Sequence, residues 1–132
     1  MSKTTKALLI DVTSKTITQF DLSSEYGSIY RAIGNGCELF CCPIEFDNGD
    51  GLYADDEILL RRHDIKGGFM LPNWNYPICN NALVVGCDEE GDTCDCKTDV
   101  NDLLNEIIFI DEEMAKDYRD KAILIPPTII SF

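Results

Sequence analysis

The apolar residues of this chain fall in short β-rich runs, each of which ends in turn-forming residues. The runs cover residues 6–13, 16–22, 37–46, 52–54 and 81–87. Their lengths suit strands, which average about five or six residues, better than long helices. Ser14-Lys15 separates the first two runs, and residues 47–51 (Asp-Asn-Gly-Asp-Gly) separate the next two. Since short turns join neighbouring antiparallel strands, the sequence predicts β-hairpins.

Helical spacing of apolar residues recurs in three other segments, each preceded by a side chain that caps helices. The expected helices lie at about residues 26–33, 98–107 and 112–120, with Ser23 or Ser24, Thr98 and Asp111 as their N-caps. The buried face of the second helix is expected to hold Val100, Leu103, Leu104 and Ile107. Residues 58–62 fit either a short helix or a strand, and Pro43 indicates an edge strand or a bulge. The predicted fold class is α+β: an antiparallel sheet of β-hairpins with two or three short helices, in a single domain over residues 1–132.

The acids are distributed unevenly along the chain. Residues 1–44 hold four acids and four bases, so the net charge of -13 belongs to residues 45–132. The stretch from Asp88 to Asp120 is the densest, with 13 acids against three bases. A surface of one negative sign repels nucleic acid and anionic membrane, and it attracts basic surfaces. Direct binding to nucleic acid or to a membrane is therefore not expected.

The N-terminus and the cysteines indicate a cytoplasmic protein. Only four apolar residues (7–10) precede Asp11, fewer than a secretory signal needs, and no apolar run approaches the length of a membrane span. Seven cysteines without such a signal are expected to be reduced thiols rather than a disulfide framework. No CxxC pair occurs and His63 is the only histidine, so no metal or cofactor is expected.

The sequence offers no recognisable catalytic motif. It has no GxSxG elbow, no phosphate-binding P-loop and no GxGxxG. His63 lies between Arg62 and Asp64 in a charged segment, which is typical of a solvated surface histidine. We therefore expect no catalytic residues and a protein that acts by binding.

The leading hypothesis is an acidic face that binds a basic protein surface. Its expected residues are Asp88, Glu89, Glu90, Asp92, Asp99, Asp102, Glu106, Glu112, Glu113 and Asp117. Carboxylates repeated every three or four residues on a rigid helix can imitate a row of phosphates, so DNA mimicry is one form of this hypothesis. The alternative is that these acids only keep the protein soluble.

Two further hypotheses remain open. Arg61, Arg62 and Lys66 form the one small basic cluster, and they would hold the phosphate of a nucleotide-like ligand while Trp74 or Tyr76 stacks on its base. Alternatively, the apolar tail Ile123–Phe132 would join copies of the chain in a homo-oligomer or in a larger particle.

Several motifs, taken in order, resemble a family of small acidic proteins of unknown function that bacteriophages, plasmids and their hosts encode. They are Lys6–Asp11 with Ile17-Thr18, Ser28–Tyr30 with Ile33-Gly34, Asn48–Asp50 with Leu52-Tyr53 and Asp55–Glu57, Asn81–Gly86, and Asp88–Gly91. The resemblance covers about residues 6–107 and leaves residues 108–132 as a C-terminal extension. It implies a mobile-element context, in which small non-enzymatic proteins redirect host machinery or counter host defences. It supplies no catalytic residues.

Overall fold

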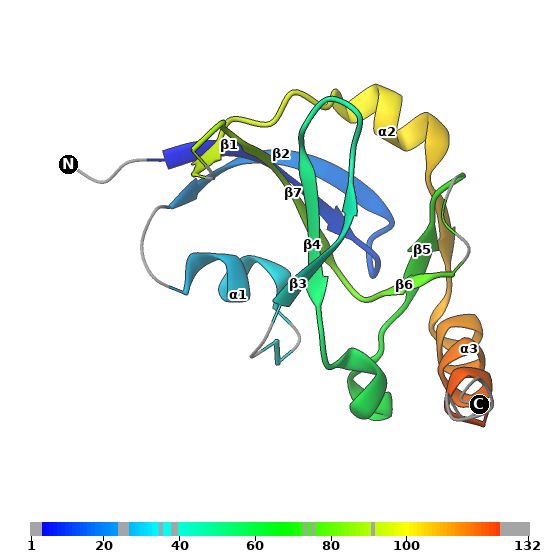
Figure 1. The fold of residues 1–132 in the computed structure, drawn as a ribbon. Coiled ribbons are helices and arrows are strands. Elements are labelled where there is room, and N and C mark those ends of the chain that lie inside the picture. The colour runs from blue at the N-terminus through cyan, green and yellow to red at the C-terminus, as the bar shows by residue number, and fades with distance from the viewer. Residues whose placement is uncertain are drawn as a thin grey trace, which may run out of the picture.

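Most of the strands form one antiparallel sheet, drawn in Figure 1. The computed structural model describes residues 4–23, 27–34, 36–37, 40–72, 74, 76–90 and 92–124, without the side chains of 122–124. The order in the large sheet is β2 (Thr16–Ser23), β1 (Thr4–Asp11), β7 (Ala82–Cys87), β4 (Gly51–Asp55) and β3 (Phe40–Glu45), and β8 (Thr93–Cys94) pairs with the end of β7. The α+β class expected from the sequence is confirmed.

β7 lies in the middle of this sheet, between β1 and β4. Its side chains alternate between the two faces, because successive residues of a strand point in opposite directions. Leu83 and Val85 pack with the helix α1 (Ser28–Ile33) on one face. Ala82 and Val84 belong to the larger core on the other face. A continuous apolar run suits this position, since both faces are covered.

The larger core is closed by a second, three-stranded sheet and by the helix α2 (Val100–Glu106). The order in the small sheet is β6 (Ile78–Cys79), β5 (Gly68–Met70) and β9 (Ile108–Ile110), all antiparallel. Phe69 of β5 and Leu103 of α2 are fully buried against the large sheet. Residues 108–110 were assigned to the C-terminal extension, but they form β9 and pair with β5.

The helix α3 (Glu112–Leu124) and two 3-10 turns, η1 (Ile58–Leu60) and η2 (Arg62–Asp64), lie at the end of the small sheet (Figure 1). Ala115 of α3 is buried with Ile58, Ile65 and Ile110 in a third cluster. For the undecided segment at 58–62 the short-helix alternative is therefore correct, in the form of 3-10 turns.

Two of the expected helix caps are wrong. α1 begins at Ser28 after its N-cap Gly27, whose φ of 85° favours glycine. Ser23 is the last residue of β2, and the alternative cap Ser24 lies outside the described residues. α2 is capped by Asp99, whose carboxylate accepts from the N–H groups of Asn101 and Asp102. Thr98 is not the cap, because its hydroxyl is bonded to the β3–β4 turn, where it donates to Asp50 and accepts from the side-chain amide of Asn48 at 3.1 Å. The Asp111 cap is present, with its Oδ1 2.8 Å from the N–H of Met114.

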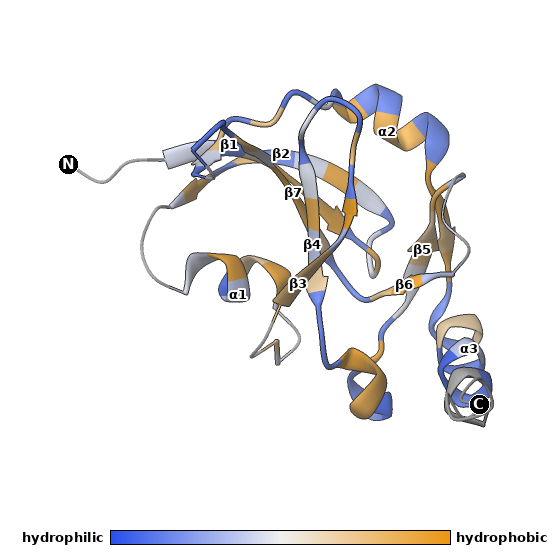
Figure 2. Ribbon diagram, in the orientation of Figure 1, coloured by the Kyte–Doolittle hydropathy of each residue, from blue (hydrophilic) through white to orange (hydrophobic). Residues whose placement is uncertain are grey.

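The hydropathy of α2 follows its burial, with apolar residues toward the core and polar residues toward solvent (Figure 2). Leu103 and Ile107 are buried and Val100 packs against them, as expected. Leu104 is 40% exposed, because it lies beyond the edge of the apolar stripe rather than within it.

The expected oligomer contact, Ile123–Phe132, lies outside the residues whose side chains the structure describes. Among the described residues, no helix has both the length and the apolar composition needed to cross a membrane.

Candidate functional site: an apolar groove with an acidic rim

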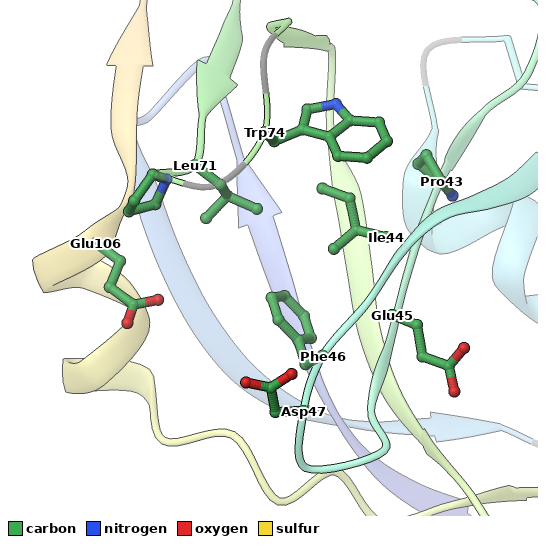
Figure 3. Close-up of a pocket in the computed structure, with 9 residues that line it drawn as sticks. Pro43, Ile44, Glu45, Phe46, Asp47, Leu71, Trp74 and Glu106 are labelled. Carbon is green, nitrogen blue, oxygen red and sulfur yellow. The ribbon is translucent and has the colours of Figure 1, made fainter.

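A groove of about 480 Å³ lies beside the edge strand β3 (Figure 3). Three separate parts of the chain form it: β3 with the turn that follows, the loop between β5 and β6, and the end of α2. Its lining residues are Pro43, Ile44, Glu45, Phe46, Asp47, Leu71, Pro72, Trp74 and Glu106. This volume is within the range of about 300–1,000 Å³ that is typical of ligand sites.

The walls of the groove are apolar and rest on the larger core. Leu71 is buried, and Ile44, Phe46 and Trp74 are half-buried against the same cluster. The backbone N–H of Trp74 donates to the carbonyl of Leu71 at 3.1 Å, which turns the loop so that the indole covers the groove. Tyr76 packs edge-on against Trp74, with 5.6 Å between ring centroids. The apolar walls therefore pack on the larger core, and Trp74 also packs against Tyr76.

The rim of the groove carries three carboxylates and no basic residue. Glu45, Asp47 and Glu106 are all exposed. Within the part of the chain that the structure describes, none of the three side chains makes an ion pair or a hydrogen bond. In Figure 3 the carboxylates of Asp47 and Glu106 lie at the end of the groove away from Trp74. The site therefore combines an apolar interior with free negative charge at its edge.

A buried aspartate fixes the turn that carries Asp47. Asp50 is fully buried, and its carboxylate accepts from the N–H groups of Lys97 and Thr98 and from the hydroxyl of Thr98 at 2.6 Å. These bonds join the β3–β4 turn to the segment that leads into α2. Asn48 strengthens the turn by accepting from the N–H of Asp50 at 2.9 Å. The turn that carries Asp47 is thus held to the segment that precedes α2, the helix that ends at Glu106.

The ten acids expected to form one face are all exposed, and they lie on three elements. Asp88 to Asp92 belong to the turn between β7 and β8, the next three to α2 and its cap, and the last three to α3. Figure 1 shows these elements at separate ends of the molecule, with the small sheet between α2 and α3. The structure brings only Glu106 of the ten to the groove.

Four of the ten acids have structural partners. The carboxylate of Asp88 accepts from two N–H groups of its own turn, and Asp99 caps α2. Glu112 pairs with Lys116 at 2.7 Å, which lowers the pKa of Glu112, and Asp117 pairs with Lys121 at 3.0 Å. The other six carboxylates make no hydrogen bond or ion pair within the described residues: Glu89, Glu90, Asp92, Asp102, Glu106 and Glu113.

The residues of the proposed nucleotide pocket are not assembled into one site. The guanidinium of Arg61 is paired with Asp55 and Asp64, which raises the pKa of Arg61, and Arg62 is paired with Asp120 at 3.0 Å. The Nζ of Lys66 donates to the carbonyl of His63 at 3.4 Å. None of these three bases lines the groove of Trp74, so an anion there would meet carboxylates instead.

The remaining reactive groups are the thiols and the single imidazole. No group of three or more metal-ligating side chains occurs among the described residues. Burial raises the pKa of the Cys79 thiol to about 11, so this thiol is protonated at neutral pH. Burial and the neighbouring Asp56 likewise raise the pKa of the Cys41 thiol to about 11. His63 is exposed at the surface, 3.7 Å from Asp64.

Sequence reasoning selected Trp74 and Glu106 but did not place them together, and it did not identify Ile44, Phe46 or Leu71 as parts of a site. Pro43 was the available signal, because it marked the edge strand beside which the groove lies. Comparison with protein-family models, with curated proteins and with solved structures finds no match to this chain.

Proposed function

We propose that this chain is a non-enzymatic acidic protein that binds a basic protein surface. The observation that carries the proposal is the set of six exposed carboxylates, on the β7–β8 turn, α2 and α3, that have no partner within the described residues. Exposed charges of one sign attract a surface of the opposite sign, and a basic partner would supply counter-charges to these carboxylates.

The expected setting is the cytoplasm of a bacterial host, with the chain encoded by a phage or another mobile element. The resemblance to small acidic mobile-element proteins supports this setting. Host takeover or interference with a defence factor would follow if the basic surface belongs to a nuclease or a polymerase. Imitation of DNA phosphates is one form that such binding would take.

The proposal is tested by the salt dependence of complexes with this chain. The tagged full-length chain is used to isolate bound proteins from a bacterial lysate, and each purified partner is then titrated at 50 and 300 mM NaCl. We expect the dissociation constant to rise by about tenfold or more over this range, because salt screens exposed charges. A dissociation constant indifferent to salt would refute electrostatic capture.

A variant identifies the charges responsible. Replacing Glu90 and Glu113 by glutamine removes two carboxylates that make no hydrogen bond or ion pair within the described residues. Replacing Glu112 and Asp117, which already have lysine partners, serves as the matched comparison. The first set should weaken binding more than the second.

A further inference from the structure

We infer that the groove beneath Trp74 holds a lysine or arginine side chain from an extended segment of the basic partner. This inference rests on the proposed function and specifies where one part of the partner binds. The occupant is a protein side chain with a long apolar stem and a cationic end, because the groove offers an apolar interior that ends in carboxylates.

The walls fit the stem of such a side chain. Ile44, Phe46 and Leu71 provide apolar surface, and the methylene groups of lysine and arginine bury readily along such surface while their charged ends stay near water. Trp74 adds an indole ring, which attracts a cation placed over its face. An uncharged apolar side chain would fill the walls but leave the rim carboxylates without a partner.

The rim fits the cationic end. Asp47 and Glu106 face no base in the lining of the groove, so a positive charge at this end would find two carboxylates, while that of Glu45 points away from them (Figure 3). The base next to this rim, Lys97, uses its Nζ to donate to the carbonyl of Asn48 at 3.2 Å and is not part of the lining. The same rim disfavours a phosphate or a carboxylate as the occupant.

The edge strand itself disfavours a different mode of binding, in which the partner adds a strand to the sheet. Pro43 has no N–H to donate, and the register of β3 shifts between Cys41 and Ile44, which is a bulge. Both features block the pairing of a further strand along an edge. A side chain that enters the groove requires neither.

Glu106 is placed where a carboxylate costs stability. It is the last residue of α2, and the carbonyl end of a helix carries partial negative charge. A residue that opposes the local electrostatics of its helix, without any partner in the described fold, is better explained by an external ligand than by folding.

The inference is tested with a blocked octalysine peptide and the full-length chain. Trp74 is the only tryptophan of the protein, so its fluorescence reports occupation of the groove while calorimetry reports total binding. The matched probe is the octamer of 2,4-diaminobutyric acid, which carries the same number of amino groups on stems two methylenes shorter. We expect octalysine to change the Trp74 fluorescence and to bind more tightly than the short-stem peptide.

The variant pair is Asp47→Asn with Glu106→Gln, and its control is Glu112→Gln with Asp117→Asn, which removes equal charge from α3 at two carboxylates that already have lysine partners. All four side chains are exposed, so folding should be retained. The rim pair should weaken octalysine binding by about tenfold, and the control pair by less than about twofold.

Equal losses in the two double variants, or an unchanged Trp74 signal while calorimetry detects binding, would overturn the groove as the site and leave the proposed function standing. If octalysine does not bind at low salt by either method, the proposed function fails together with the inference.

Discussion

Carboxylates serve opposite purposes near Arg61 and at the rim of the groove. Asp55 has a side chain that is 1% exposed, and it is paired with Arg61, which also holds Asp64 at 2.7 Å. Asp47 and Glu106 at the rim are exposed and have no partner within the described residues. The first set holds the η1–η2 segment in place. The side chains of the second set make no hydrogen bond or ion pair within the described residues, so they are available to a ligand.

This difference shows that the net charge of the chain does not by itself measure its binding capacity. Acids that cap helices, close turns or pair with arginine are already used by the fold, even where the sequence counts them as part of an acidic region. Substitutions that remove one carboxylate at a time should separate the two sets by their effect on stability.

The largest effect is expected from Asp50→Ala. Removing this buried carboxylate leaves the N–H groups of Lys97 and Thr98 without an acceptor, which should lower the free energy of unfolding by about 3 kcal/mol. Asp47→Ala in the same turn is the control and should change it by less than about 0.5 kcal/mol. Urea denaturation measures both. Similar changes in the free energy of unfolding for the two variants would contradict the distinction between acids that stabilise the fold and acids that have no partner in it.

Arg61→Met is expected to have the next largest effect. It leaves the buried carboxylate of Asp55 without its cation, and we expect a loss of about 2 kcal/mol, reduced from the value for a fully buried pair because Arg61 is partly exposed. Arg62→Met, which breaks the exposed pair with Asp120, should change stability much less. The midpoint of urea denaturation compares them.

Arg61→Met should also alter how the free energy of unfolding depends on pH. The hydrogen bond from Arg61 lowers the pKa of Asp64 below its usual value in unfolded chains. The Arg61–Asp64 pair therefore contributes fully to the free energy of unfolding above about pH 4. This contribution is lost as the pH falls through the lowered pKa of Asp64. The stability difference between wild type and Arg61→Met should thus shrink in acid. A difference that grows below pH 4 would contradict the assignment.

Asp99→Ala tests an acid that sequence counting assigned to the binding face but that caps α2. Loss of the cap should cost about 1 kcal/mol, because the N–H groups of Asn101 and Asp102 lose their acceptor. Asp102→Asn, about one turn further along α2, should lower the free energy of unfolding by only a few tenths of the loss expected for Asp99→Ala. Thermal denaturation followed by circular dichroism distinguishes them, and equal costs would show that Asp99 does not act as a cap.

Local features of the sequence predicted the parts of the fold that depend on neighbouring residues. The predicted turns at Ser14-Lys15 and at residues 47–51 join paired strands, with Gly51 already part of β4, because turn geometry is set by a few consecutive residues. Pro43 indicated an edge strand or a bulge, and both are present. The apolar run at residues 81–87 predicted a strand, and β7 covers residues 82–87.

Features that depend on distant contacts were not predicted. β5 and β9 are three residues each, too short for a periodic signal, and pair across about 40 residues of chain. The cap of α2 was misplaced by one residue because Thr98 and Asp99 are both good caps, and only the distant Asp50 decides between them. The groove draws on segments that nothing in the sequence connects, so Trp74 was grouped with the nearby arginines instead of with Glu106.

The smallest stability effect, and the one of opposite sign, is expected from Glu106→Gln. Removing a negative charge from the last residue of α2 relieves repulsion with the carbonyl end of the helix, which should raise the free energy of unfolding by about 0.3 kcal/mol. The same substitution should weaken the binding of octalysine, because the cationic end loses a carboxylate. Differential scanning calorimetry and titration calorimetry on one preparation measure both quantities.

Glu113→Gln, in the first turn of α3, is the matched control: there a carboxylate favours the helix, so the same change should slightly lower stability and leave the groove unaltered. If both variants lose stability equally, Glu106 has an unrecognised role in the fold and the contrast between the two sets of acids is weakened at the residue where it matters most.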